Sequence, residues 1–275
     1  WVSEDIAAGK GLSTAPLPAW VSEIEGVHTA AGSYAPAKKA FVPRSTLPVY
    51  QRQAFPAALV GENGADPKTA GTTVLENDAI RLWHQGDDVL IASFKTKMNT
   101  IGPDVLDGLV QAIEIAEKDY AGLVIWQTGS ITGGPFSAGA DLQAAMPLFM
   151  QGGAKAVEPF VKKFQDTAMR VKYAQVPVVA AVAGLALGGG CETLMHCAHR
   201  VAHLESYIGL VELGVGLVPA GGGLKEAALR ASTASNTTGI SNQTEFIKPW
   251  FQNVAMANVA KSARDAQSIG YLLPT

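Results

Sequence analysis

The stretch that decides the fold is LGGGCE at residues 187–192, which joins a predicted buried strand to a predicted short helix. Small residues at such a junction leave the first backbone amides of the helix uncovered, and the helix dipole favours negative charge beside them. A second turn of this kind, FSAGADL at residues 136–142, also lies between a strand and a helix. Two uncovered amides can form an oxyanion hole, in which each donor lowers a barrier by about 3–4 kcal/mol. Either turn alone is equally consistent with close packing, whereas the pair favours a site.

Two glutamates lie in otherwise apolar segments. Glu192 occupies the first turn of the predicted helix, where a carboxylate also suits the helix dipole. Glu212 lies within IGLVELG at residues 208–214. An isolated glutamate in such a segment is either desolvated and functional or exposed to water at a strand end. The glycines on both sides of Glu212 favour a site over an exposed edge.

From Thr72 onward the sequence alternates between apolar strand patterns and amphipathic helix patterns. The predicted strands are residues 89–94, 122–127 and 177–182. The predicted helices open at Pro103 and cover residues 159–173 and 243–259, with a loop at 231–242 and a last helix capped by Ser262 and ended by Gly270. Because strands joined through helices pair in parallel, this alternation predicts an α/β fold with helical crossovers.

The first 73 residues differ from the rest of the chain. They carry seven of the fifteen prolines, which are scattered so that no long helix or strand pattern runs between them. We interpret residues 1–73 as an irregular linker or tail and not as an independent domain.

Composition excludes several classes of function. The net charge is −3, the sequence pI is about 6.0, and no run of five like charges occurs, so nothing predicts binding to nucleic acid or to an anionic membrane. No apolar run reaches the ~18 residues that suggest a membrane span. Cys191 and Cys197 lie in an apolar stretch and fit a cytoplasmic protein with reduced thiols better than a disulfide framework.

Other patterns point less clearly to chemistry. His196, His199 and His203 could suggest a metal site, but the predicted helix ends near Arg200, which separates them, and no nearby carboxylate completes a ligand set. We therefore predict no metal. The GVG run at residues 214–216 lacks the third glycine and the later acidic residue of a dinucleotide loop, and no G-x-S-x-G elbow indicates a serine hydrolase.

In their order and spacing, several motifs together resemble the enoyl-CoA hydratase (crotonase) superfamily. They are FSAGADL at 136–142, ALGGGCE at 186–192, GLVE at 209–212 and PAGGG at 219–223. Within that superfamily, KTKMNTIG at 95–102 and the helix at 250–262 look most like the hydratase part of bifunctional fatty-acid oxidation proteins, which also carry a 3-hydroxyacyl-CoA dehydrogenase.

This resemblance implies a crotonase-like spiral of repeated ββα turns with a helical surround over residues 74–275, preceded by the irregular Pro-rich segment. Residues 1–73 would then be the junction with a preceding dehydrogenase part. Free-standing members of the family usually form trimers, so the expected partners are two further copies of the chain or a dehydrogenase part of the same parent protein. The family uses no metal and no separate cofactor, since coenzyme A enters as part of the acyl-CoA substrate.

The resemblance also implies the reaction, which is hydration of 2-trans-enoyl-CoA to 3-hydroxyacyl-CoA in fatty acid β-oxidation. Glu192 would activate the water that attacks the β-carbon, and Glu212 would deliver a proton to the α-carbon. The amides of Ala140 and Gly189 would bind the thioester oxygen. The residues expected along the coenzyme A and acyl path are Lys97, Met98, Ala138, Asp141 and Leu142.

The sequence departs from the family pattern at three places. Ala220 replaces a common glycine, LKE at residues 224–226 replaces the usual Thr-Gln-Arg, and the chain ends at Thr275, before the C-terminal helices that usually cover the acyl pocket. These departures leave the reaction type intact and bear on chain-length preference and on trimer contacts.

Two alternative functions remain open at this point. Isomerisation of a 3-enoyl-CoA needs one glutamate as a proton shuttle, so the presence of two favours a hydratase. A non-catalytic acyl-CoA-binding fragment of a larger multienzyme, which docks a partner through its Pro-rich segment, would bind an acyl-CoA without turning it over.

Overall fold

The computed structural model describes residues 18–24, 26–29, 32–43, 46 and 70–273, and the chain divides into two compact units at residues 1–66 and 67–275. The first unit holds helix α2 (Trp20–Glu23) and an antiparallel sheet of β1 (His28–Thr29), β2 (Gly32–Ala35) and β3 (Ala40–Val42). The ring of Tyr34 stacks on Trp20 and meets Phe41 edge-on, with centroids 5.4 and 5.5 Å apart. Much of the predicted linker lies outside the described residues.

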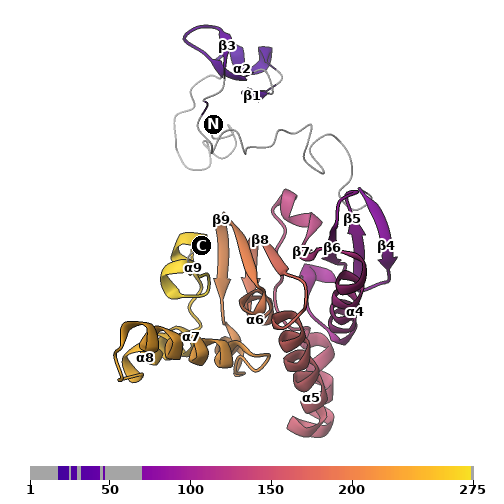
Figure 1. Cartoon of the computed structure of the whole chain (residues 1–275), viewed down its shortest axis with the longest axis vertical. Helices are drawn as coiled ribbons and strands as arrows, with labels where there is room; N and C mark the ends of the chain where they lie inside the picture. The colour runs from indigo at the N-terminus through magenta and orange to yellow at the C-terminus, as the bar shows by residue number, and fades with distance from the viewer. Residues whose placement is uncertain (1–17, 25, 30–31, 44–45, 47–69, 274–275) are drawn as a thin grey trace, which may run out of the picture. The chain divides into compact units, whose positions relative to one another are not determined.

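The second unit is built on a six-stranded sheet with the order β4-β5-β6-β7-β8-β9 (Figure 1). Its strands are β4 (Thr72–Glu76), β5 (Ile80–His84), β6 (Val89–Phe94), β7 (Gly122–Trp126), β8 (Val178–Leu187) and β9 (His199–Gly209). β4, β5 and β6 pair antiparallel, whereas β6, β7, β8 and β9 pair parallel. The predicted parallel pairing with helical crossovers is therefore confirmed for the four strands from β6 to β9.

Helices join these strands and cover the sheet. They are α4 (Pro103–Asp119), α5 (Leu142–Lys172), α6 (Gly189–His196), α7 (Gly223–Thr238), α8 (Thr244–Ala255) and α9 (Ala263–Ile269), with short 3₁₀ helices η2 (Lys97–Asn99), η3 (Thr128–Thr132) and η4 (Glu212–Val215). α4 packs on β6, β7 and α5, while α7, α8 and α9 gather at the β9 end of the sheet (Figure 1). Within the described ranges, no helix is both long and apolar enough to cross a membrane.

Helix α4 shows how the sequence pattern sets the packing. Pro103 stands in its first turn, where the missing N–H would have no helical partner in any case. The residues predicted to share its apolar face are all buried: Val105, Leu109, Ala112, Ile113 and Ala116. A side-chain carbon at Gly108 would lie 2.5 Å from Ile80 Cγ2, so the helix lies close against β5 at that point.

Helix α5 begins at Leu142, well before the predicted start at residue 159. The carboxylate of Asp141 caps it by accepting hydrogen bonds from two amides of the first turn, at 3.0 and 3.2 Å. The chain kinks at Gly153, where φ is 64°, and Pro159 lies beyond the kink instead of opening the helix.

The segment predicted as a loop at 231–242 is mostly the second half of α7, so that prediction was wrong. Its serines, threonines and asparagine have low helix propensity because their side chains compete for backbone hydrogen bonds. In the helix, three hydroxyls donate to carbonyls four residues earlier, each at 2.9 Å: Thr233, Thr237 and Thr238. Ala231 and Ser235 are buried, so packing overrides the local preference.

The core of the second unit should depend strongly on β7, whose Ile125 is fully buried. Ile125→Ala should lower the free energy of unfolding by about 2–5 kcal/mol, because it leaves a cavity between the sheet and the helices. Urea denaturation curves measure this change. The control Val74→Ala lies on the edge strand β4, where the side chain is 42% exposed, and should change stability by less than about 0.5 kcal/mol. Equal effects of the two substitutions would contradict the assignment of β7 to the core.

Candidate active site

The turn at residues 136–142 is held by the loop that precedes α4. The amide of Ala138 donates to the carbonyl of Met98 at 3.1 Å, and the amide of Ile101 donates to Gly139 at 2.8 Å. Met98 has a φ of 55°, a conformation that non-glycine residues rarely adopt. The backbone of this loop is therefore shaped to fit the turn.

The two small-residue turns bring the amides of Ala140 and Gly189 together. A side-chain carbon at Gly189 would lie 3.1 Å from the nitrogen of Ala140 and 2.9 Å from Cζ of Phe164, so only glycine leaves this space open. In the part of the chain that the structure describes, neither amide donates a hydrogen bond. Gly189 is also the first residue of α6, whose dipole favours negative charge there. The pair has the donors that an oxyanion hole requires.

Glu192 lies in the first turn of α6 and is 3% exposed. One carboxyl oxygen accepts a hydrogen bond from the amide of Gly223 at 2.8 Å. Burial, together with the negative charge of Glu212, raises the pKa of Glu192 to about 8. Glu192 therefore holds its proton at a pH where an exposed glutamate is ionised.

Glu212 begins η4, just beyond the end of β9. Both of its carboxyl oxygens are buried, and neither accepts a conventional hydrogen bond within the described ranges. Burial raises its pKa, while its own backbone amide, the carboxyl group of Glu192 and the backbone amide of Val211 act in the opposite direction. A side-chain carbon at Gly188 would lie 3.4 Å from Oε1 of Glu212, so this carboxyl group lies against the second turn.

The two carboxyl groups therefore interact with each other at the place where the two turns meet. Burying a carboxylate without a partner is costly, and a second one nearby adds repulsion unless the pair retains a proton. Such a pair costs stability, and strongly shifted pKa values of this kind cluster at functional sites. The arrangement can bind a developing oxyanion at the amides and move protons at the carboxyl groups.

The other predicted site residues take different places. The backbones of Met98 and Ala138 are joined by the hydrogen bond described above, and the side chains of Met98, of Lys97 in η2 and of Leu142 at the start of α5 are exposed. The carboxylate of Asp141 caps α5. The side chain of Asp141 therefore has a structural role that does not require a substrate.

Of the three histidines considered for a metal site, the first ends α6, because the helix stops at His196 and not near Arg200 as predicted. His199 and His203 are exposed on β9, whereas His196 is buried with Nδ1 2.7 Å from the backbone oxygen of Glu192. No cluster of residues suited to hold a metal ion occurs among the described residues. The contact between His196 and Glu192 was not predicted.

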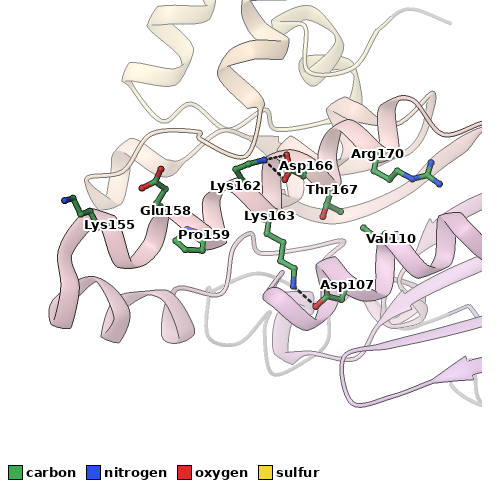
Figure 2. Close-up of a pocket in the computed structure, with 10 residues that line it drawn as sticks. All are labelled: Asp107, Val110, Lys155, Glu158, Pro159, Lys162, Lys163, Asp166, Thr167 and Arg170. Atoms are coloured by element: carbon green, nitrogen blue, oxygen red, sulfur yellow. Dashed lines mark hydrogen bonds and ion pairs between the residues drawn. The ribbon is translucent and has the colours of Figure 1, made fainter.

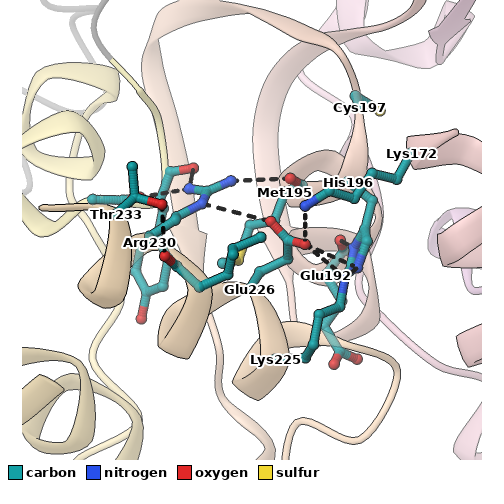
Figure 3. A network of polar contacts seen from close by, with 12 residues as sticks. Lys172, Glu192, Met195, His196, Cys197, Lys225, Glu226, Arg230 and Thr233 are labelled. Carbon is teal, nitrogen blue, oxygen red and sulfur yellow. Dashed lines mark hydrogen bonds and ion pairs between the residues drawn. The ribbon is translucent and has the colours of Figure 1, made fainter. Parts of the chain in front are cut away.

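Sequence reasoning also missed a polar network beside α6 (Figure 3). The buried Glu226 accepts hydrogen bonds from Lys172 and Lys225, at 2.5 and 2.6 Å. Arg230 donates to the carbonyl of Met195 at 2.9 Å, and its Nε lies 3.9 Å from the carboxylate of Glu226. The i, i+4 spacing of Glu226 and Arg230 was the signal available in the sequence. The network ties α5, α6 and α7 together.

A separate cavity of about 730 Å³ lies between α4 and α5 (Figure 2). Most of its charged side chains are in ion pairs: Lys162 with Asp166, Lys163 with Asp107, and Arg170 with Glu117. Neither Glu192 nor Glu212 lines this cavity. Its volume therefore does not mark the position of the candidate chemistry.

Comparison with known proteins links the chain to one family. The family model described as enoyl-CoA hydratase/isomerase matches residues 89–240, more than half of the chain. The chain is 35% identical over 202 residues to a probable 3-hydroxyacyl-CoA dehydrogenase of Bacillus subtilis, and 36% identical over 196 residues to a putative fatty acid oxidation complex trifunctional enzyme of Rickettsia felis. These matches cover 74% and 71% of this chain but 24% and 26% of the relatives, so the chain spans about a quarter of their length.

The solved structures agree at the level of the fold. The crystal structure of an enoyl-CoA hydratase from Polaromonas matches with a TM-score of 0.57 at 21% identity, over 70% of this chain and 69% of that one. A second enoyl-CoA hydratase, from Bacillus anthracis, matches with a TM-score of 0.54 at 22% identity, over 70% and 68%. The α/β crotonase-like fold expected from the sequence is confirmed.

Glu192→Gln should raise the stability of the chain at alkaline pH. The pKa of Glu192 is about 8 in the folded chain against an ordinary value of 4.5, so the stability that its proton contributes is complete below about pH 4.5 and is lost as the pH rises through about 8. Glutamine stays neutral, keeps an oxygen for the amide of Gly223 and offers an N–H to Glu212. Calorimetry near pH 9 should give a Tm at least about 3 °C above that of the unmodified chain, with a smaller difference near pH 5.

Glu205→Gln, at an exposed position on β9, is the control, and its Tm should show no such dependence on pH. Equal Tm values for Glu192→Gln and the unmodified chain near pH 9 would contradict the buried pair.

Proposed function

The chain belongs to the enoyl-CoA hydratase/isomerase family, and on that premise we propose that it adds water to a 2-trans-enoyl-CoA to give a 3-hydroxyacyl-CoA, as in fatty acid β-oxidation. The observation that carries the proposal is the buried pair of interacting carboxyl groups, Glu192 and Glu212, beside two uncovered amides. Hydration needs both kinds of group, because charge develops on the thioester oxygen and two protons move.

The amides of Ala140 and Gly189 bind the thioester oxygen in the proposed reaction. When water attacks the β-carbon, the electrons of the double bond move toward that oxygen and form an enolate. Amides that the two turns hold in place need no reorganisation as this charge develops, and each contributes about 3–4 kcal/mol to the transition state. Placing Gly189 at the first turn of α6 adds the helix dipole to the same effect.

The two glutamates carry the protons. Glu192 accepts a proton from the attacking water, and Glu212 gives a proton to the α-carbon. A coupled pair that holds one proton supplies a base and an acid at the same pH, and its pKa values belong to the pair. Glu192 acts as the base when the shared proton lies on Glu212, and after turnover the proton that Glu192 has gained returns to Glu212 across the contact between them. The exchange leaves the proton count of the pair unchanged.

The second glutamate separates this proposal from isomerisation of a 3-enoyl-CoA. An isomerase moves one proton between two carbons of the substrate, which a single carboxylate can do. Burying two carboxyl groups together lowers the stability of the fold. A reaction that uses both groups accounts for this loss, whereas a reaction that uses one does not. The pair therefore favours hydration over isomerisation and over a fragment that binds without turnover.

We also propose that this chain is the hydratase part of a longer fatty-acid oxidation protein, with residues 74–275 as the hydratase and residues 1–73 as the junction to a 3-hydroxyacyl-CoA dehydrogenase part. The names and lengths of the relatives support this, because one is called a dehydrogenase and another a trifunctional enzyme. A dehydrogenase oxidises the hydroxyl group that hydration creates. The buried free thiols of Cys191 and Cys197 fit the predicted cytoplasmic location, and the homotrimer stays a prediction.

Replacing either glutamate should abolish most of the hydratase activity. Glu192→Gln and Glu212→Gln should each lower kcat by at least about 100-fold, since each removes one proton-transfer group. The loss of absorbance of the conjugated thioester of a short 2-trans-enoyl-CoA measures the rate, and Glu205→Gln is the matched control. An unchanged rate in either variant refutes the proposed hydratase, and faster turnover of a 3-enoyl-CoA than of a 2-enoyl-CoA by the unmodified chain favours the isomerase.

Gly189→Ala should close the oxyanion site while leaving both glutamates in place. The added carbon lies 3.1 Å from the nitrogen of Ala140, where the thioester oxygen is expected. Loss of this contact should lower kcat by about 100- to 1,000-fold. Infrared difference spectra of a ¹³C=O-labelled acyl-CoA should show a low-frequency carbonyl band on binding to the unmodified chain and not to the variant. Gly129→Ala, at a position where a side-chain carbon meets nothing within 4 Å and the backbone does not have the positive φ that favours glycine, is the control, and a polarised band that persists in Gly189→Ala would contradict the assigned donors.

A further inference from the structure

His196 lies directly beneath Glu192, one helical turn further along α6. It is 2% exposed, and its Nδ1 lies 2.7 Å from the backbone oxygen of Glu192. On the other side of the ring, Nε2 lies 2.8 Å from Nζ of Lys225. The ring therefore bridges the turn that carries Glu192 and the beginning of α7, and Figure 3 shows it between them.

The neighbours of His196 define which ring nitrogen carries the proton. A carbonyl oxygen can only accept, so Nδ1 donates to Glu192, and an ammonium group can only donate, so Nε2 accepts from Lys225. Burial, with the positive charges of Lys225 and Lys172 nearby, lowers the pKa of His196 to about 4, although the carbonyl of Glu192 and the charge of Glu226 act the other way. The imidazole is therefore neutral and fixed in one tautomer at neutral pH.

The same ring also supports the glycine turn that binds the carboxyl group of Glu192. Gly222 has a φ of 124°, and a side-chain carbon there would lie 2.6 Å from Cε1 of His196, so the turn packs directly on the imidazole. The next residue, Gly223, donates its amide to Oε1 of Glu192. His196 thus contacts both the backbone of Glu192 and the turn that holds its side chain.

Lys225 is held in place by its second partner. Its Nζ donates to Glu226 at 2.6 Å, and Lys172 donates to the same carboxylate oxygen at 2.5 Å. Because Glu226 is buried and receives both lysines, the ammonium group of Lys225 is fixed where it meets the ring of His196. The orientation of the ring therefore does not depend on packing alone.

From these contacts we propose that His196 is a positioning residue for Glu192, whose neutral ring holds the helix turn and the glycine turn at the spacing that places the carboxyl group beside Glu212. This inference rests on the proposed function, because it concerns how one of the two proton-transfer groups, the carboxyl group of Glu192, is held in position. His196 touches no reacting atom. It acts through the backbone of Glu192 and through the amide of Gly223.

Two amide substitutions separate the contacts of the ring. In His196→Asn, the side-chain nitrogen takes roughly the position of Nδ1, so it keeps the hydrogen bond to Glu192 and loses the contact with Lys225. The side chain of His196→Gln reaches roughly the position of Nε2, so it keeps the contact with Lys225 and loses that with Glu192. If His196 positions Glu192, the Asn variant should keep more activity than the Gln variant. If His196 only fills space, the order should be reversed, because glutamine is closer to histidine in size.

Kinetics on a 2-trans-enoyl-CoA should show this ranking. His196→Gln should lower kcat by about 10- to 100-fold with KM within about twofold, because misplacing a proton-transfer group slows the reaction more than it weakens binding. His196→Asn should keep kcat within about threefold of the unmodified chain. His199→Asn, at an exposed position on β9, is the matched control and should change neither constant. The opposite order, or equal losses in the Asn and Gln variants, overturns the proposal.

A measurement without turnover separates this inference from the proposed function. In chains labelled with ¹³C at the glutamate carboxyl groups, NMR titration should show that the raised pKa of Glu192, about 8 in the unmodified chain, persists in His196→Asn and falls by at least about one unit in His196→Gln, as the carboxyl group moves toward water. Should the unmodified chain fail to hydrate any 2-enoyl-CoA, the proposed function fails and this titration still decides the role of His196. An unchanged titration of Glu192 in a folded Gln variant refutes that role.

Discussion

The rest of the site depends on keeping two carboxyl groups buried against each other. A carboxylate taken out of water loses several kcal/mol of solvation unless a proton, a cation or a hydrogen-bond donor compensates for it. Here the raised pKa of Glu192, about 8, keeps that carboxyl group protonated at neutral pH, and the amide of Gly223 supplies a donor. A side-chain carbon would lie 2.7 Å from a carboxyl oxygen of Glu192 at Gly221 and 3.1 Å from the other at Gly223. The glycines there are required by the space that the carboxyl group occupies.

The parallel sheet explains how residues far apart in the sequence form this pair. β8 and β9 run side by side and pair along most of their length, and parallel strands end at the same edge of a sheet. The turn after β8 carries Gly188 and Gly189, and the segment after β9 carries Glu212. The amide of Gly188 donates to the carbonyl of Gly209 at 2.9 Å, which joins the two ends directly. Ligand sites at the carboxyl ends of parallel strands follow from the same geometry.

The charges beside α6 are arranged so that the pair keeps its proton. A cation close to Glu192 would favour its ionised form and lower its pKa. Lys172 and Lys225 both donate to Glu226, and Lys225 meets the neutral ring of His196 on its other side. Glu226 thus takes up the positive charge at the beginning of α7, and the carboxyl group of Glu192 has a backbone amide as its neighbour instead of an ammonium group.

The sequence by itself determined the features that depend on neighbouring residues. It gave the strand at 89–94, the buried face of α4, the Ser262 cap and the Gly270 end of α9, because periodicity and capping act over a few residues. It also singled out Glu192 and Glu212, since a glutamate among apolar residues and glycines is conspicuous. Only the tertiary structure decided that α7 extends to Thr238 and that His196 lies beneath Glu192. Each of these depends on burial and on distances between separate elements, which no local pattern encodes.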